Sequence, residues 1–116
     1  MGTKASGSPD VMRVDPVLAE IVRRLAEAYR PWRIYLFGSH ALGNTNPDSD
    51  YDVFVVVPDD APPEQTRSQL GYQALRGTGV ATDVLVATRR SFERRLHLPA
   101  SLPAVVSREG RVVYGT

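Results

Sequence analysis

The sequence has 116 residues, of which 42% are hydrophobic, with no cysteine and a formal net charge of +1. This length predicts one domain, and the missing cysteines exclude disulfides, thiolate zinc sites and cysteine nucleophiles. The small net charge argues against an extended nucleic-acid footprint, and no apolar run reaches the roughly 18 residues of a membrane span. We therefore expect a soluble cytoplasmic protein that does not insert into a membrane.

The first 14 residues differ in composition from the rest. Met1 to Asp10 contain Gly, Ser and Lys but no apolar stretch, which predicts a disordered tail over residues 1–14 and no signal peptide. The domain, residues 15–116, then begins at Asp15-Pro16, where the aspartate suits an N-cap and the proline the first helical position. Apolar residues follow at helical spacing. We expect this helix to end before Pro31.

Two strands follow. Residues 33–37 are apolar and β-prone and predict a short strand. Gly38-Ser39 ends it, residues 40–42 suit one helical turn, and residues 43–49 are dense in turn formers. Residues 51–57 form the strongest strand pattern, because their valines and phenylalanine are apolar on both faces, as in a central buried strand.

The second half predicts smaller elements. A helix is expected over 64–76, although Gly71 weakens it, and a third strand over 80–87. A short helix capped by Ser91, a helix over 100–108 and an edge strand over 111–114 complete the chain. This order predicts an α/β (α+β) fold with a small mixed β-sheet flanked by helices.

The chemistry lies in the middle of the chain. Asp50 and Asp52 are two residues apart at the head of a strand, so both carboxylates face the same side. Like charges at that spacing repel each other, and Mg²⁺, which prefers hard oxygen ligands, would relieve the repulsion. If the next strong strand lies beside this one, Asp83 brings a third carboxylate. Gly38 and Ser39 suit a phosphate cradle. Together they indicate phosphoryl or nucleotidyl transfer.

These residues also carry a family resemblance. Residues 36–43 (LFGSHALG) and 48–53 (DSDYDV) hold Gly-Ser, a ten-residue gap and Asp-x-Asp. The pattern resembles the DNA polymerase β-like nucleotidyltransferase superfamily, and within it the minimal nucleotidyltransferase (MNT) proteins of prokaryotes. The resemblance implies the nucleotidyltransferase fold.

The resemblance also assigns roles within the site. It implies that Asp50 and Asp52 bind two Mg²⁺ ions and that Asp83 ligates the catalytic metal and helps deprotonate the acceptor hydroxyl. Gly38 and Ser39 would hold the β- and γ-phosphates of ATP or another NTP. A further nucleotide-binding residue is Ser49, which would orient the metal loop by hydrogen bonding.

The resemblance further implies a partner. Small MNT proteins are often antitoxins of HEPN-type toxins, and some transfer AMP to a tyrosine of the toxin. We therefore expect a Mg-dependent nucleotidyltransferase that modifies a cognate HEPN toxin. Relatives often have arginine where His40 and Leu42 stand, which favours the alternative of a catalytically weak antitoxin that neutralises its partner by binding. A small-molecule, aminoglycoside-like nucleotidyltransferase is a third hypothesis, and it would need a homo-oligomer to build its pocket.

Other residues have structural explanations beside functional ones. Asp83 alone could be a strand-edge charge, and His97 is expected to be a surface or structural residue. An arginine cluster after the third strand suits either a solvated helix face or a surface toward the nucleotide or an acidic partner; it comprises Arg89, Arg90, Arg94 and Arg95. Aromatic residues around the first strand are expected in the core, namely Tyr29, Trp32 and Tyr35.

Overall fold

A single mixed sheet organises the chain. The computed structural model describes residues 15–38 and 50–115, and within these ranges four strands pair in the order β3-β2-β1-β4. The strands are β1 (Arg33–Phe37), β2 (Tyr51–Val57), β3 (Thr82–Thr88) and β4 (Arg111–Tyr114). Strand β1 is antiparallel to β2 and β4, whereas β3 is parallel to β2. The predicted mixed sheet is therefore confirmed, while the predicted tail (1–14) and loop (43–49) lie outside the described residues.

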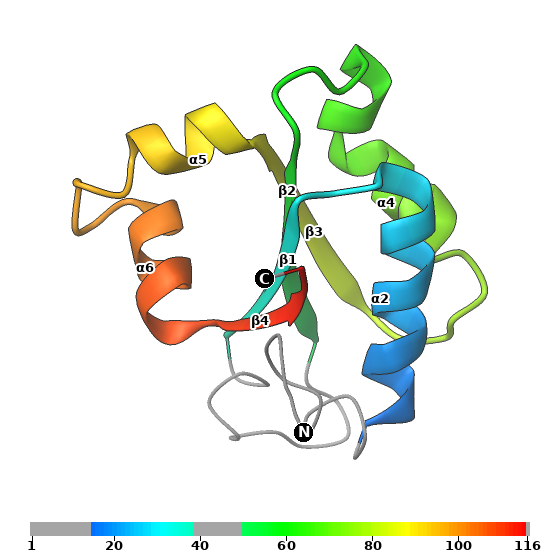
Figure 1. Ribbon diagram of the computed structural model, residues 1–116. Coiled ribbons are helices and arrows are strands. Elements are labelled where there is room, and N and C mark those ends of the chain that lie inside the picture. The colour runs from blue at the N-terminus through cyan, green and yellow to red at the C-terminus, as the bar shows by residue number, and fades with distance from the viewer. Residues whose placement is uncertain (1–14, 39–49, 116) are drawn as a thin grey trace, which may run out of the picture.

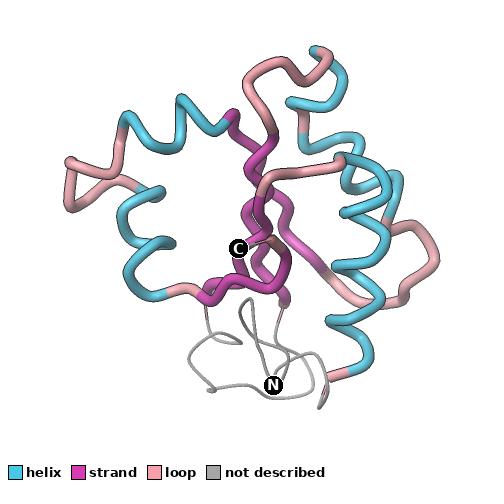
Figure 2. The backbone as a smooth tube through the Cα atoms, in the orientation of Figure 1, coloured by secondary structure: helices cyan, strands magenta, loops and turns pink. Residues whose placement is uncertain are grey.

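Helices cover both faces of this sheet, which makes three layers (Figures 1 and 2). One face carries α2 and α4, and the other carries α5 and α6 (Figure 1). Their bounds are α2 (Pro16–Tyr29), the 3₁₀ turn η1 (Pro63–Thr66), α4 (Ser68–Ala74), α5 (Arg89–Arg94) and α6 (Leu102–Glu109). No helix in the described part of the chain is long and apolar enough to cross a bilayer.

Helix α2 begins and ends as its sequence predicts. The Asp15 carboxylate accepts a hydrogen bond from the backbone N–H of Leu18 at 3.1 Å, and Pro16 occupies the first turn. After Tyr29, Arg30 adopts a left-handed conformation with φ of 48°, one residue before Pro31. This geometry confirms the predicted N-cap and the predicted stop.

Strand β2 supplies the core of both faces. Val53, Val55 and Val57 pack toward α2 and α4, whereas Phe54 and Val56 pack on the opposite face toward Phe92 and Val106. All seven of its residues except Asp52 are buried, so the expected central strand is confirmed. Because side chains alternate along a strand, the same residues that fill two cores also fix which face Asp52 occupies.

The helix expected over 64–76 is interrupted. Arg67 has extended backbone between η1 and α4. The buried Tyr29 hydroxyl donates to the Arg67 carbonyl and accepts from the Gly71 N–H at 2.7 Å. A Cβ on Gly71 would lie 2.7 Å from the Val84 side chain, so this glycine allows α4 to pack closely on β3. A single continuous helix over this range was therefore wrong.

The remaining boundaries shift by one to three residues. Strand β3 begins two residues later than expected, and α5 begins at Arg89 because Thr88, rather than Ser91, is its N-cap. The Thr88 hydroxyl accepts from the Ser91 N–H at 3.2 Å. Helix α6 begins at Leu102. The edge strand over 111–114 is confirmed as β4.

Candidate active site

The topology brings the predicted site residues together where three neighbouring strands begin or end, at one edge of the sheet. Strand β1 ends where the antiparallel β2 begins, and the parallel β3 begins beside it. In register, Asp52 lies opposite Phe37 on β1 and opposite Asp83 on β3. Neighbouring strands are about 4.8 Å apart, and paired residues share a face. The two carboxylates are therefore neighbours, on the face that also carries α5 and α6.

Gly38 meets Asp52 from the other side. Its φ of +78° is a backbone conformation that favours glycine. A Cβ at this position would come closer than 3.0 Å to Oδ2 of Asp52. The glycine predicted to let a phosphate approach thus also leaves the space that the Asp52 carboxylate occupies.

Tyr51 fixes the strand between the two aspartates. Its hydroxyl donates a 2.8 Å hydrogen bond to the Asp15 carboxylate, whose other oxygen caps α2. Its backbone N–H donates to the Ala81 carbonyl, just before β3. Burial, followed by the hydrogen bond to Asp15 and that group's charge, raises the pKa of Tyr51 to about 12. Sequence reasoning missed this link, although an aspartate cap and a tyrosine inside the Asp-x-Asp motif were both visible.

The other predicted residues are less closely assembled. Asp50 is exposed and precedes the first pair of the β2–β3 ladder, Tyr51 with Thr82. Among residues 15–38 and 50–115, no group of three or more His, Cys, Asp or Glu side chains gathers as a metal site would require. The structure therefore pairs Asp52 with Asp83 without drawing Asp50 into a triad. Predictions for other positions lie outside the described residues, namely Ser39, His40, Leu42 and Ser49.

The carboxylate oxygens of this pair nevertheless suit a hard divalent cation as ligands. Asp52 and Asp83 offer only carboxylate oxygens, which Mg²⁺ prefers. Asp52 is half-buried and Asp83 exposed, so the pair is open to solvent and to a ligand. The bare Gly38 backbone leaves room for the Asp52 carboxylate. These residues are therefore suited to hold a metal beside a phosphate.

Farther along the same face, helix α5 covers the sheet. Phe92 of α5 stacks on Tyr35 with a centroid distance of 5.3 Å and meets Phe54 edge-on at 5.4 Å. Tyr35 is 3% exposed and Phe54 is 5% exposed, so this cluster is a second core. Tyr29 and Tyr35 are in the core as predicted. Trp32 is instead half-buried between two arginines.

The Trp32 ring lies between the guanidinium groups of Arg33 and Arg89, at 4.2 and 4.1 Å from its centroid. Arg89 also pairs with Glu93 at 3.1 Å. The cation–π contact with Arg89 was not predicted, because it joins residues 57 positions apart. His97, the histidine among the described residues, is exposed, as expected for a surface residue.

Comparison with known families identifies the fold. The model of the nucleotidyltransferase domain family matches residues 18–112. The chain belongs to this family. Its nucleotidyltransferase domain therefore matches over the whole sheet up to Val112, including Gly38, Asp52 and Asp83.

Two solved structures share the fold of this nucleotidyltransferase domain. A candidate nucleotidyltransferase from Sulfolobus solfataricus is similar with a TM-score of 0.58 and 19% identity, over 90% of this chain and 83% of that one. A crystal structure of a toxin–antitoxin with AMP-PNP is similar with a TM-score of 0.51 and 20% identity, over 83% of this chain and 72% of that one. No curated protein matches the sequence. The predicted nucleotidyltransferase fold is confirmed.

Proposed function

We propose that this domain transfers AMP, or another nucleoside monophosphate, from an NTP to a tyrosine hydroxyl of a cognate HEPN-type toxin and thereby acts as its antitoxin. The observation that carries the proposal is the pairing of Asp52 with Asp83 beside Gly38. Two carboxylates and a bare backbone position at one sheet edge suit a nucleotide with its metal. The likeness to a toxin–antitoxin structure with AMP-PNP supports the biological context.

Each residue takes a defined part in this proposal. Gly38 and Ser39 hold the terminal phosphates, and Ser49 orients the loop before Asp50. Asp50, Asp52 and Asp83 would hold Mg²⁺, which when bound supplies charge neutralisation at the phosphates. Asp83, on the outermost of the three strands, lies on the side opposite Gly38 and so faces the acceptor.

The transfer itself is a displacement at phosphorus. The acceptor oxygen forms a bond to the α-phosphorus, and the bond from that phosphorus to the bridging oxygen breaks. Pyrophosphate leaves with the electron pair, and the hydroxyl proton passes to the Asp83 carboxylate. Asp83 is exposed, so a partner's side chain can reach it.

Incubation with a HEPN protein encoded beside this chain tests the proposal. The two proteins are mixed with Mg²⁺ and each of the four NTPs, labelled at the α-phosphate. We expect label on the partner, and we expect Asp52→Asn and Asp83→Asn to lower the rate at least about 100-fold, because groups that stabilise transferring phosphates contribute several kcal/mol. Asp60→Asn is the matched control, since Asp60 is exposed in the turn after β2 and should leave the rate unchanged.

Two outcomes would overturn the proposal. A tight complex that transfers nothing from any NTP would make the protein an antitoxin that acts by binding alone. Transfer to an aminoglycoside without a partner would make it a small-molecule nucleotidyltransferase.

A further inference from the structure

The outer side of β3 is an open edge of the sheet. Strand β3 lies at one end of the strand order, and none of the other described strands pairs with its outer side. It is seven residues long, and its register with β2 is unbroken from Thr82 to Thr88. At the opposite end of the sheet, β4 has only four residues and an irregular register with β1. Long, regular edge strands are templates for pairing with another strand, whereas short or irregular edges resist it.

The backbone of β3 shows which residues present hydrogen-bonding groups on this outer side. The Tyr51 N–H donates to the Ala81 carbonyl, so that carbonyl points toward β2. The Val84 N–H points the other way, because it donates to the Tyr72 hydroxyl of α4. Backbone groups alternate in direction along a strand, so the even-numbered residues of β3 present theirs outward.

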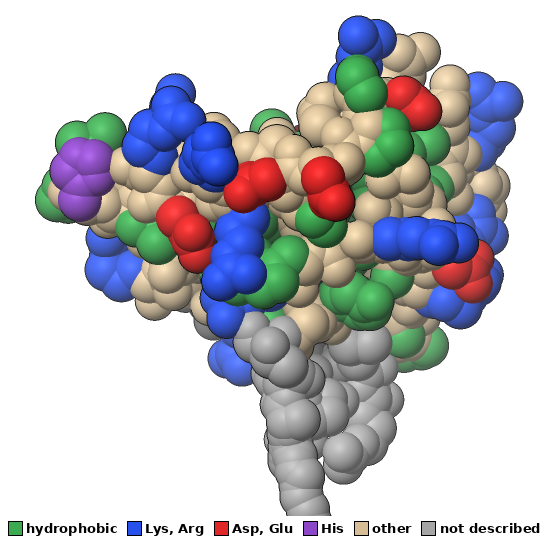
Figure 3. Space-filling model, turned by 45° about the horizontal axis from the view of Figure 1, so that its top comes forward, with side chains coloured by type: hydrophobic (Ala, Val, Ile, Leu, Met, Phe, Trp, Pro, Cys, Tyr) green, Lys and Arg blue, Asp and Glu red, His purple; other side chains and the backbone are tan. Residues whose placement is uncertain are grey.

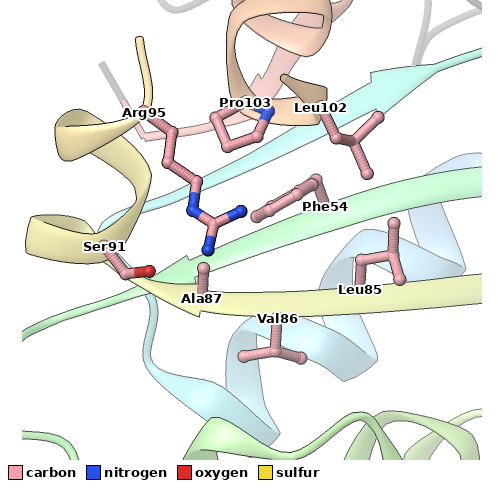
Figure 4. A pocket seen from close by; sticks show the side chains of 8 residues that line it. All are labelled: Phe54, Leu85, Val86, Ala87, Ser91, Arg95, Leu102 and Pro103. Atoms are coloured by element: carbon pink, nitrogen blue, oxygen red, sulfur yellow. The ribbon is translucent and has the colours of Figure 1, made fainter. Parts of the chain in front are cut away.

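The side chains along this edge are mostly apolar. Asp83 is the only charged residue from 82 to 88, and this range contains neither lysine nor proline, which commonly protect edge strands. Figure 4 shows Leu85 and Ala87 pointing from β3 toward the face that carries Leu102, and Val86 pointing to the other face. Leu85 and Leu102 are 38% and 39% exposed, and both line one small pocket. An exposed apolar surface beside an open strand indicates a binding surface.

The sequence of β3 is almost symmetric about its middle residue. It reads TDVLVAT, with Leu85 at the centre. If a second copy pairs antiparallel about Leu85, the two leucines lie opposite each other and each Val84 lies opposite the partner's Val86. Val84 and Val86 both present their backbone groups outward, so they can exchange hydrogen bonds as an antiparallel ladder requires, and facing valines stabilise a sheet. Strand β3 is therefore complementary to a second copy of itself, as a two-fold symmetric interface requires.

The charges are compatible with this pairing. Asp83 would lie opposite the partner's Ala87, and the two Asp83 carboxylates would be four positions apart along the ladder, about 13 Å, so they would repel each other little. Antiparallel pairing also places the end of one β3 beside the start of the other. Arg89 and Arg90 follow directly after β3 and are exposed, and basic side chains gather over α5 in Figure 3. The basic start of α5 would thus lie toward Asp83 of the partner subunit, where opposite charges attract.

One contact of the single chain must be exchanged on pairing. The Val84 N–H donates to the Tyr72 hydroxyl at 3.2 Å, at the long end of the usual range, and the carbonyl of the partner's Val86 would replace that hydroxyl. Tyr72 is 48% exposed, so its hydroxyl can turn to water. The hydroxyl therefore competes with pairing without blocking it, and its removal should favour the paired state.

We propose that two copies of this chain pair along β3, antiparallel and centred on Leu85, so that their two four-stranded sheets join into one continuous sheet. This interface goes beyond the proposed function and does not depend on the transfer reaction. Pairing occurs in the plane of the sheet, whereas side chains stand perpendicular to it, so Asp83 stays open on its face. Each site then has α5 of the partner subunit as a basic neighbour.

Cysteine cross-linking tests the centre of the pairing. The protein contains no cysteine, so a single substitution in the full chain can form a disulfide only between two copies. Leu85 would lie opposite itself in a non-hydrogen-bonded pair, with Cα atoms about 4.5 Å apart, which a disulfide can span. Ala87→Cys is the matched control, because it lies on the same face of the same strand but about 13 Å from its equivalent. With a mild oxidant we expect covalent dimers of Leu85→Cys and none of Ala87→Cys.

Sedimentation of the full chain measures the same interface without a cross-link. Between roughly 1 and 100 μM, the range in which a micromolar dimer dissociates, the protein should change from monomer to dimer. Leu85→Lys should raise the dissociation constant of the dimer at least about tenfold, because it replaces a central apolar pair with two like charges. Leu98→Lys is its control, since Leu98 is 47% exposed but lies outside β3, and it should leave that constant unchanged. Tyr72→Phe should lower the constant about fivefold, because the competing hydroxyl is gone.

Four results would contradict the inference. A chain that stays monomeric at every concentration and does not cross-link through Leu85→Cys has no such interface. A dimer that Leu98→Lys dissociates and Leu85→Lys does not would be formed by the connection between α5 and α6. Covalent dimers of Ala87→Cys alone would require another register, and a dimer weakened by Tyr72→Phe would mean that the hydroxyl does not compete with pairing. Leu85, Leu98 and Tyr72 are exposed, so the far-UV circular dichroism of their variants should match that of the parent protein.

Discussion

Replacing Gly38 with alanine distinguishes an effect on stability from an effect on catalysis more sharply than removing a carboxylate does. The added Cβ would come closer than 3.0 Å to Oδ2 of Asp52, and the φ of +78° disfavours any side chain. Gly77 provides the matched control, because its φ is +89° and a Cβ there would meet nothing within 4 Å. Both variants therefore share the backbone penalty, and only one displaces the Asp52 carboxylate.

The expected magnitudes follow from this difference. A left-handed conformation costs an alanine about 1–2 kcal/mol, so both variants should melt several degrees lower. The clash at Gly38 involves the far end of the Asp52 side chain, which can rotate away, and so adds little to the loss of stability. A displacement of about 1 Å in a reacting group, by contrast, can lower the rate about 100-fold. Gly38→Ala should therefore lose transfer activity that Gly77→Ala keeps.

Two measurements check this expectation. Thermal unfolding should give similar melting temperatures for the two variants. Transfer of labelled AMP to the partner, together with calorimetric binding of Mg-ATP, should fall in Gly38→Ala alone. If Gly38→Ala transfers AMP within threefold of Gly77→Ala, Asp52 does not need the position that the structure gives it, and the site is wrongly assigned.

Three further predictions concern the supports of the site. The pKa of Tyr51 rises from about 10 to about 12 on folding, so its contribution to stability is complete below pH 10 and is lost as the pH rises toward 12; the stability difference between the parent protein and Tyr51→Phe in urea should shrink over that window. Tyr29→Phe leaves the buried Gly71 N–H without its partner and should cost about 1–3 kcal/mol in urea unfolding. Asp83→Asn removes one of two like charges that lie directly opposite each other and should raise the free energy of unfolding by about 0.2–1 kcal/mol at low salt. This increase should be smaller in 0.5 M salt, which screens the repulsion. The control variant Asp60→Asn should show no such increase.

The sequence predicted the sheet because its strands carry strong local signals. The valine run of β2 alternates between two cores, and a strand buried on both faces is hard to mistake. The helix over 64–76 was mispredicted because a residue far away decides it. The Tyr29 hydroxyl bridges Arg67 and Gly71, and no local pattern announces a hydrogen bond across 38 or 42 positions.

The candidate site was predictable in part for the same reason. Gly38, Asp50 and Asp52 belong to one short motif, whereas Asp83 depended on β3 lying beside β2, which only the structure shows. The small pocket between the sheet and helices α5 and α6 was invisible in the sequence, since its lining residues Phe54 and Arg95 are 41 positions apart and are brought together by the packing of α5 on the sheet. Local motifs thus predicted the reacting groups, and tertiary packing decides what can bind beside them.

The two faces of the sheet differ: one is buried along its whole length and stabilises the fold, and the other carries the candidate site. On the α2 and α4 face, buried residues run the full length of β2, from Tyr51 to Val57. On the opposite face the core stops at Phe54, and the next position toward the start of the strand is Asp52. A valine there would extend the core and would not repel Asp83, so the carboxylate pair lowers the stability of the sheet. Destabilising groups held in place by ordered neighbours such as Tyr51 and Gly38 are characteristic of functional sites, which is why this edge, rather than the charged helix surfaces, is where binding should be tested first.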